Sequence, residues 1–200
     1  MGTVKSLLLG MCFVLGACTS QTSTVQTTEK GTQWEWQNGT IVVKTPERPA
    51  GQKSVLGLTT PKLEAVRVGF VGLGMRGPGA VERFTYIPGT QVVALCDYEE
   101  ARADKCQELL KKASMPKAAV YSGDKGYEEL CKRDDIDLVY VAADWLHHFP
   151  VAKCALENGK NVAIEVPSAM NLQECWDLIN LNLPVSIASF WRTAAMTGSR

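Results

Sequence analysis

Three glycines, Gly72, Gly74 and Gly77, form a Gly-x-Gly-x-x-Gly pattern directly after the apolar run at residues 66–71. In a strand–turn–helix context this spacing is typical of a turn that binds the pyrophosphate of a dinucleotide. The first glycine permits the tight turn, the second lets the backbone approach the phosphates, and the third lets helix and strand pack closely. The helix N-terminus then faces the phosphates. We predict a dinucleotide site here; the alternative is a glycine-rich turn with a purely structural role.

An acidic residue, Asp97, follows Gly77 by twenty residues and ends a second apolar run. A carboxylate there can accept hydrogen bonds from both ribose hydroxyls of NAD, and it would repel the 2′-phosphate of NADP. NAD is therefore the predicted cofactor, and helix capping is the alternative role of Asp97. Arg76, inside the glycine turn, either pairs with the pyrophosphate or stays solvated.

The only two histidines of the chain, His147 and His148, follow another apolar run, in the segment Asp144-Trp145-Leu146-His147-His148. Trp145 offers a flat wall for a nicotinamide ribose, and a histidine can donate to a hydroxyl or shuttle protons. The alternative is that Asp144 caps a helix beside two surface histidines.

Glu165, Val166 and Pro167 follow the next apolar run. The Glu165 carboxylate either orients nicotinamide or substrate, or is an ordinary loop carboxylate. Pro167 is expected to stiffen the loop.

These residues need a scaffold that brings the ends of separate apolar runs together. The patterns predict strands at 66–71, 92–96, 119–121, 136–142 and 161–166, and helices at 77–86, 99–113, 126–132, 149–157 and 171–180. Such alternation predicts an α/β protein with a Rossmann-type, doubly wound parallel sheet. Ligands of such sheets bind beyond the carboxyl ends of the strands, where the residues above lie.

Composition narrows the function classes. Lys+Arg and Asp+Glu are equal at 21 each, so no bulk charge favours nucleic acid. The seven cysteines show no CxxC pairing and no zinc-ligand spacing, so we expect no metal site and no disulfide scaffold. No apolar run after the N-terminus reaches the roughly 20 residues of a membrane span.

The N-terminus predicts export. Residues 1–18 combine Lys5 with an apolar core at 7–15, as in a signal peptide. Leu15-Gly16-Ala17-Cys18 resembles a bacterial lipobox, which implies lipidation of Cys18 and a lipid-anchored protein of the bacterial cell envelope, in the periplasm or outer membrane. The alternative is an ordinary cleaved signal in which Cys18 is incidental.

Residues 19–61 are predicted to be a tether and an extended segment rather than a domain. Residues 19–30 are rich in Thr, Ser and Gln and hold too little apolar surface to fold. Residues 31–61, with Trp34 and Trp36, are expected to drape over the domain at 62–180. Asn38-Gly39 is predicted to be a turn.

The stretch from Val66 to about Asn180 resembles the cofactor domain of the Gfo/Idh/MocA oxidoreductase family. Members commonly carry Glu-Lys-Pro after the fifth strand, and the lysine serves sugar dehydrogenation. Val166 replaces that lysine here, which puts an ordinary dehydrogenase role in doubt. The variant instead resembles glycoside hydrolase family 109, the NAD-dependent α-N-acetylgalactosaminidases, in residues 66–86, 135–140, 145–148, 162–167 and 174–180.

This resemblance implies removal of terminal α-N-acetylgalactosamine from a glycan or glycoside by oxidation at C3 with bound NAD, elimination, water addition and re-reduction. The paired carboxylates of ordinary glycosidases are then unnecessary. The residues it implies for NAD are Met75, Arg76, Asp97, Trp145, Leu146, His147, His148, Glu165 and Val166. The catalytic residues are expected mainly in a C-terminal substrate domain that this chain lacks, with a contribution from His148. Two other functions remain open: an exported NAD-dependent sugar oxidoreductase, and a non-catalytic NAD-binding or sugar-binding remnant.

The segment at residues 181–200 departs from the family pattern. Pro184 stops the preceding helix, and no strand follows to close the fold. A shift of reading frame across Ser186–Thr197 permits a segment ending Leu-Glu-Asn-Cys-Cys-Tyr-Asp, which is similar to the family's next strand. We therefore predict a frameshift between Asn180 and Ser186, in the gene or its sequencing, and expect the truncated chain itself to be an inactive fragment.

Overall fold

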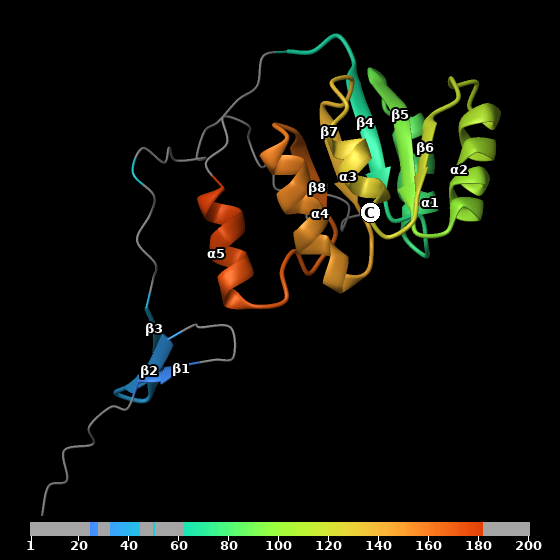
Figure 1. Cartoon of the computed structure of the whole chain (residues 1–200). Coiled ribbons are helices and arrows are strands. Elements are labelled where there is room, and N and C mark those ends of the chain that lie inside the picture. Colours follow the sequence, from blue (N-terminus) through green and yellow to red (C-terminus); the bar gives the residue numbers. More distant parts are fainter. Residues whose placement is uncertain (1–24, 28–32, 45–49, 51–61, 182–200) are drawn as a thin grey trace, which may run out of the picture.

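A parallel sheet forms the centre of the described structure. The computed structural model describes residues 25–27, 33–44, 50 and 62–181. Five strands pair in the order β6-β5-β4-β7-β8 (Figure 1). Their bounds are β4 (Val66–Val71), β5 (Thr90–Asp97), β6 (Ala119–Ser122), β7 (Leu138–Val141) and β8 (Asn161–Ile164). All neighbouring pairs are parallel, which confirms the predicted Rossmann-type fold.

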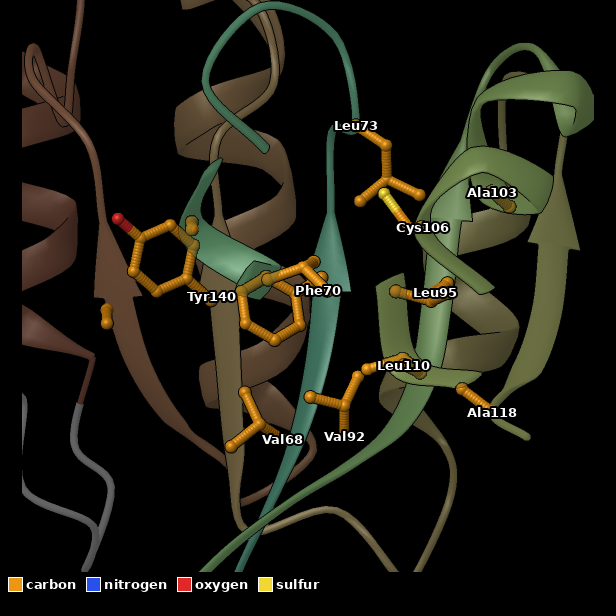
Figure 2. Close-up of a cluster of buried hydrophobic side chains, with 13 residues drawn as sticks. Val68, Phe70, Leu73, Val92, Leu95, Ala103, Cys106, Leu110, Ala118 and Tyr140 are labelled. Carbon is orange, nitrogen blue, oxygen red and sulfur yellow. The ribbon is translucent and has the colours of Figure 1, made fainter. Parts of the chain in front are cut away.

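Helices cover both faces of this sheet. They are α1 (Gly77–Thr85), α2 (Glu100–Lys112), α3 (Gly126–Cys131), α4 (Trp145–Glu157) and α5 (Leu172–Asn180). Figure 1 shows α3 and α4 in front of the strands. Side chains of α1 and α2 share one buried cluster with Phe70 and Leu95, drawn in Figure 2. Side chains of α3 and α4 share a second cluster with Val71 and Val139. Because the strands are buried on both faces, they read in the sequence as continuous apolar runs.

The chain changes direction across the sheet beside β4. From β4 it adds β5 and then β6 on one side, crosses over, and adds β7 and β8 on the other. The loops after β4 and β7 therefore diverge, and the crevice between them is where such sheets bind ligands.

The start of α4 differs from the sequence prediction. The helix begins at Trp145 rather than at residue 149, because the Asp144 side chain accepts hydrogen bonds from the N–H groups of Leu146 and His147. Pro150 lies inside the helix and is not its first residue. The shift turns Trp145, His147 and His148 from loop residues into residues of the first turn of α4.

Residues 26–43 contain a small antiparallel sheet that the sequence analysis did not predict. β2 (Gln33–Gln37) pairs with β3 (Thr40–Val43), and β1 (Gln26–Thr27) pairs with β2. Asn38 and Gly39 form the predicted turn, with φ of 50° and 79°. Trp34 and Trp36, two residues apart, precede the Asn-Gly turn, and an Ile-Val-Val run follows it; this is a hairpin signal that the expectation of an extended, draped segment did not use.

Three further observations concern only the part of the chain that the structure describes. No helix in it is long and apolar enough to cross a membrane. No group of His, Cys, Asp or Glu in it is arranged to hold a metal ion. Its five cysteines are all free thiols. The predicted signal peptide, Cys18 and the segment at 182–200 lie outside these residues.

Candidate cofactor site

The three glycines of the turn are constrained in different ways. Gly72 has a φ of +90°, and a Cβ there would lie 2.3 Å from the Ala143 nitrogen. A Cβ on Gly77 would lie 2.2 Å from the Gly72 carbonyl oxygen. A Cβ on Gly74 would meet only the Arg102 guanidinium, at 3.6 Å. The fold therefore requires the first and third glycines, whereas the missing side chain of Gly74 leaves open space above the turn.

Asp97 connects the end of β5 to this turn. Its side chain is 5% exposed, and Oδ2 accepts a hydrogen bond of 2.6 Å from the Leu73 N–H. Oδ1 accepts from the Glu99 N–H at 3.0 Å and faces the Arg102 guanidinium at 3.3 Å. Glu99, not Asp97, is the N-cap residue of α2. The alternative role of Asp97 as a helix cap is therefore wrong, and its carboxylate both holds the turn and lines the crevice.

The two arginines at this end of the site differ in their partners. Arg102 is held by two carboxylates, Asp97 at 3.3 Å and Glu99 at 2.9 Å. Arg76 is exposed and makes no ion pair with any described residue. Of the two, Arg76 is thus the cation free to pair with a phosphate beside the glycine turn.

The two histidines have different environments. The His147 ring is 43% exposed, and its Nδ1 lies 2.6 Å from the Asp144 carboxylate. Burial alone would raise the pKa of Asp144, but hydrogen bonds from the His147 ring and the backbone outweigh it, and the pKa is lowered. The expected alternative, a capping Asp144 beside a surface histidine, holds for this pair.

His148 is 1% exposed and is among the residues that line the crevice. Its Nδ1 lies 2.7 Å from the Pro167 carbonyl oxygen, which can only accept, so Nδ1 carries the proton. Nε2 is buried and has no hydrogen-bond partner among the described residues. In this tautomer Nε2 is a hydrogen-bond acceptor rather than the donor that the sequence also allowed, and an acceptor nitrogen is what the predicted proton shuttle requires. Buried polar atoms are normally paired, so this nitrogen fits a ligand hydroxyl.

Glu165 and Val166 follow β8, on the far side of the site from Asp97. Glu165 accepts a hydrogen bond of 2.7 Å from the Tyr140 hydroxyl. Val166 is 59% exposed and precedes a cis peptide bond to Pro167. The lining of the cavity contains no lysine among the residues that the structure describes.

A single cavity of about 1090 Å³ runs over these loops. It is lined by every residue predicted for the cofactor except Gly77, which packs beneath the turn: Gly72, Gly74, Met75, Arg76, Asp97, Trp145, Leu146, His147, His148, Glu165 and Val166. Other lining residues carry no motif that predicted them, namely Tyr98, Arg102, Asp124, Tyr127 and Met170. Asp124 and Tyr127 follow β6, and the strand-end rule that predicted the other walls applies to this strand as well.

A doubly wound parallel sheet with a glycine turn after its central strand and an acidic residue after the next defines a dinucleotide-binding Rossmann domain. The family profile described as "Oxidoreductase family, NAD-binding Rossmann fold" matches residues 66–182. The chain belongs to this family, Gfo/Idh/MocA, as its motifs had indicated. NAD is accordingly the cofactor of the domain.

Relatives bear names of the second predicted family. The chain is 78% identical over 183 residues to "Glycosyl hydrolase family 109 protein 4" of Phocaeicola vulgatus, covering 91% of this chain and 36% of the relative. It is 56% identical over 178 residues to "Glycosyl hydrolase family 109 protein 1" of Bacteroides thetaiotaomicron, covering 88% and 37%. These names confirm the resemblance to glycoside hydrolase family 109. The chain spans little more than a third of the length of these relatives.

Solved structures with the same fold were determined with either dinucleotide. Myo-inositol dehydrogenase from Lactobacillus casei, in complex with NAD(H) and myo-inositol, has 25% identity and a TM-score of 0.50 over 58% of this chain and 33% of that one. A variant of KijD10, a 3-ketoreductase from Actinomadura kijaniata, in complex with NADP, has 26% identity and a TM-score of 0.50 over 58% and 35%.

Proposed function

We propose that this chain carries the NAD-holding half of a glycosidase that removes terminal α-N-acetylgalactosamine. The proposal depends on the kinds of residue that line the cavity at its β8 end. Glu165 and His148 line it, the aliphatic Val166 stands where dehydrogenases of the family carry lysine, and no described lining residue is a lysine. Together with the family 109 names of the relatives, this supports hydrolysis rather than net oxidation of a sugar.

The cavity residues divide into two groups along an extended dinucleotide. The glycine turn, with Gly74 open to the cavity and Arg76 unpaired, fits the pyrophosphate. Asp97 then fits the adenine ribose, and the α4 and β8 loops fit the nicotinamide end. When bound, NAD would supply a reversible hydride acceptor for C3 of the sugar, so that the oxidised sugar can eliminate its aglycone, add water and be reduced again.

His148 is the residue of this chain that we assign to proton handling. Its orphan Nε2 can accept a hydrogen bond from a ribose or sugar hydroxyl, and the Pro167 carbonyl fixes the ring in the required tautomer. Nδ1–H also remains bonded when Nε2 takes up a proton. The remaining acid–base groups and the substrate contacts are proposed to lie outside this chain.

A second candidate is an exported NAD-dependent sugar oxidoreductase. The likeness to myo-inositol dehydrogenase favours it, as does a buried histidine acceptor that could take the proton of an alcohol under oxidation. The two functions differ in their redox balance: an oxidoreductase consumes NAD with each turnover, whereas the proposed glycosidase regenerates it within each turnover.

Redox balance is therefore the test. The gene would be expressed with the proposed frameshift after Asn180 corrected, and the protein would be assayed for co-purifying NAD and for cleavage of an aryl α-N-acetylgalactosaminide. Multiple turnovers without added NAD support the glycosidase. NADH that accumulates in step with the sugar product supports the oxidoreductase. Bound NAD without turnover supports a non-catalytic remnant.

We also propose that the protein is lipid-anchored through Cys18 in the bacterial cell envelope. The charged residue Lys5, the short apolar core and Leu15-Gly16-Ala17-Cys18 support this assignment.

A further inference from the structure

Tyr140 occupies the boundary between the apolar core and the cofactor site. The residue lies on β7 and is 2% exposed. Its ring packs against Phe70 and Phe84, with ring centroids 5.2 Å and 5.6 Å away. Figure 2 shows the hydroxyl pointing away from the other labelled side chains of the cluster. Packing on the ring therefore fixes where the hydroxyl lies.

That hydroxyl donates to a group of the cavity wall. Tyr140 lies on β7 and Glu165 directly after the neighbouring β8, and the hydroxyl lies 2.7 Å from Glu165 Oε1. Among the described residues, no other side chain or backbone group donates to the Glu165 carboxylate. A glutamate has three rotatable side-chain bonds, so one charge-assisted hydrogen bond from a rigid donor decides which way this carboxylate faces.

The surroundings of the Tyr140 phenol keep it protonated, so that it can donate a hydrogen bond. The pKa of Tyr140 is raised to about 12, first by burial and then by the hydrogen bond to Glu165, while the Arg83 guanidinium opposes the rise. At neutral pH the phenol therefore keeps its proton and remains a donor. Glu165 Oε1 is occupied by this bond, which leaves Oε2 for the cavity.

We infer that Tyr140 is a positioning residue for the nicotinamide end of the site, because it holds the Glu165 carboxylate in the orientation that meets the ligand. The inference rests on the proposed placement of the nicotinamide over the α4 and β8 loops. Tyr140 itself does not line the cavity. Its effect is transmitted through Glu165.

The test compares NAD⁺ with ADP-ribose, which lacks only the nicotinamide ring, by isothermal titration calorimetry on the 200-residue chain. Tyr140→Phe keeps the ring packing and removes the hydroxyl. We expect NAD⁺ to bind roughly tenfold more weakly, as is typical for a lost hydrogen bond to a charged group, and ADP-ribose to bind as before. In a Glu165→Ala background, adding Tyr140→Phe should cause no further loss.

Tyr121→Phe is the matched control. It also removes a phenol hydroxyl bonded to a charged side chain, Arg133 at 3.2 Å, but Tyr121 does not line the cavity. Its affinity for both ligands should equal that of the wild type. An equal loss of NAD⁺ and ADP-ribose binding in Tyr140→Phe would show a general structural effect and overturn the inference, as would unchanged NAD⁺ binding. A wild-type chain that binds neither ligand refutes the cofactor placement together with the inference. If the 200-residue chain binds NAD⁺ but the frame-corrected protein has no glycosidase activity, only the proposed reaction is refuted.

Discussion

Gly74 is a residue at which a substitution should weaken ligand binding without lowering the stability of the fold. Its backbone does not need a positive φ, and a Cβ there meets no protein atom closer than 3.6 Å. Gly74→Ala should therefore leave the free energy of unfolding unchanged or slightly higher. The added methyl group would stand in the space assigned to the pyrophosphate, so NAD⁺ affinity should fall about tenfold or more. Chemical denaturation and calorimetric titration measure the two effects separately.

Substitutions of two other glycines provide a control and a contrasting case. In Gly79→Ala the new Cβ also lies 3.6 Å from an arginine, but Gly79 is in α1 and does not line the cavity, so both measurements should stay near wild type. Gly72→Ala should lower the free energy of unfolding by more than about 2 kcal/mol, since strain at positive φ adds to a backbone clash. Wild-type NAD⁺ affinity in Gly74→Ala would contradict the assigned position of the pyrophosphate.

Asp97 is the residue on which the cofactor preference depends. Asp97→Asn keeps an oxygen for the Leu73 N–H but loses the charge and one of the acceptors available to a ribose diol. We expect NAD⁺ to bind about tenfold more weakly, and the ratio of NAD⁺ to NADP⁺ affinity to fall because the repulsion of a 2′-phosphate is relieved. Competition titrations with both dinucleotides measure the ratio. Asp104→Asn, on the exposed face of α2, is the control. An unchanged ratio would assign the discrimination to another group.

Among the helices and strands, α4 contributes several site residues from its first turn, and the Asp144 cap stabilises that turn. Asp144 accepts from the N–H groups of Leu146 and His147, so losing the cap should fray the turn that carries Trp145 and His148. Asp144→Ala should lower the free energy of unfolding by about 1 kcal/mol, whereas Asp144→Asn, which still caps, should lose less. Urea denaturation of both variants tests this, and equal stability of Asp144→Ala and wild type would contradict it.

The same cap makes a small part of the stability dependent on pH. The pKa of Asp144 is lowered in the folded chain, so its charge stabilises the fold fully above its ordinary pKa of 3.8. That contribution is lost as the pH falls below 3.8 through the lowered value, because the carboxylate then takes up a proton. The stability difference between wild type and Asp144→Asn should therefore shrink on acidification over this range. Asn171, the cap of α5, does not titrate, so Asn171→Ala should show a cost that does not depend on pH there.

The sequence predicted elements where packing and propensity agree. The buried parallel strands are continuous apolar runs between turn residues, so their existence could be recognised from residues 66–164 alone. The predicted start of α4 was wrong because Pro150 favours a helix start nearby, and the side-chain cap at Asp144, five residues upstream of the predicted start, overrides that preference. The hairpin at β2 and β3 is too short and too exposed to show a buried strand pattern, so the Asn-Gly turn and the spacing of the tryptophans were its only signals.

In the whole molecule, the site depends on contacts between the motifs as well as on the motifs themselves. Most of the lining residues could be predicted because they follow parallel strands, and the carboxyl ends of parallel strands lie at one edge of the sheet. What the sequence could not show is how residues distant in the chain are coupled. Asp97 holds the Leu73 N–H, Pro167 sets the His148 tautomer, and Tyr140 holds Glu165. These contacts depend on strand register and loop geometry, which periodicity does not encode.

The proposed location of the molecule in the cell envelope depends on a single thiol, that of Cys18. A diacylglyceryl group on Cys18 would bury long acyl chains in a bilayer, at about 0.8 kcal/mol for each methylene. Cys18→Ser should therefore abolish incorporation of labelled palmitate and move the exported protein from the membrane fraction to the soluble fraction. Cys12→Ser, inside the predicted apolar core of the signal peptide, keeps Leu15-Gly16-Ala17-Cys18 intact and should remain labelled and membrane-bound. Cleavage and secretion of Cys18→Ser with the label still attached would refute Cys18 as the anchor, and an unlabelled wild type would support an ordinary cleaved signal.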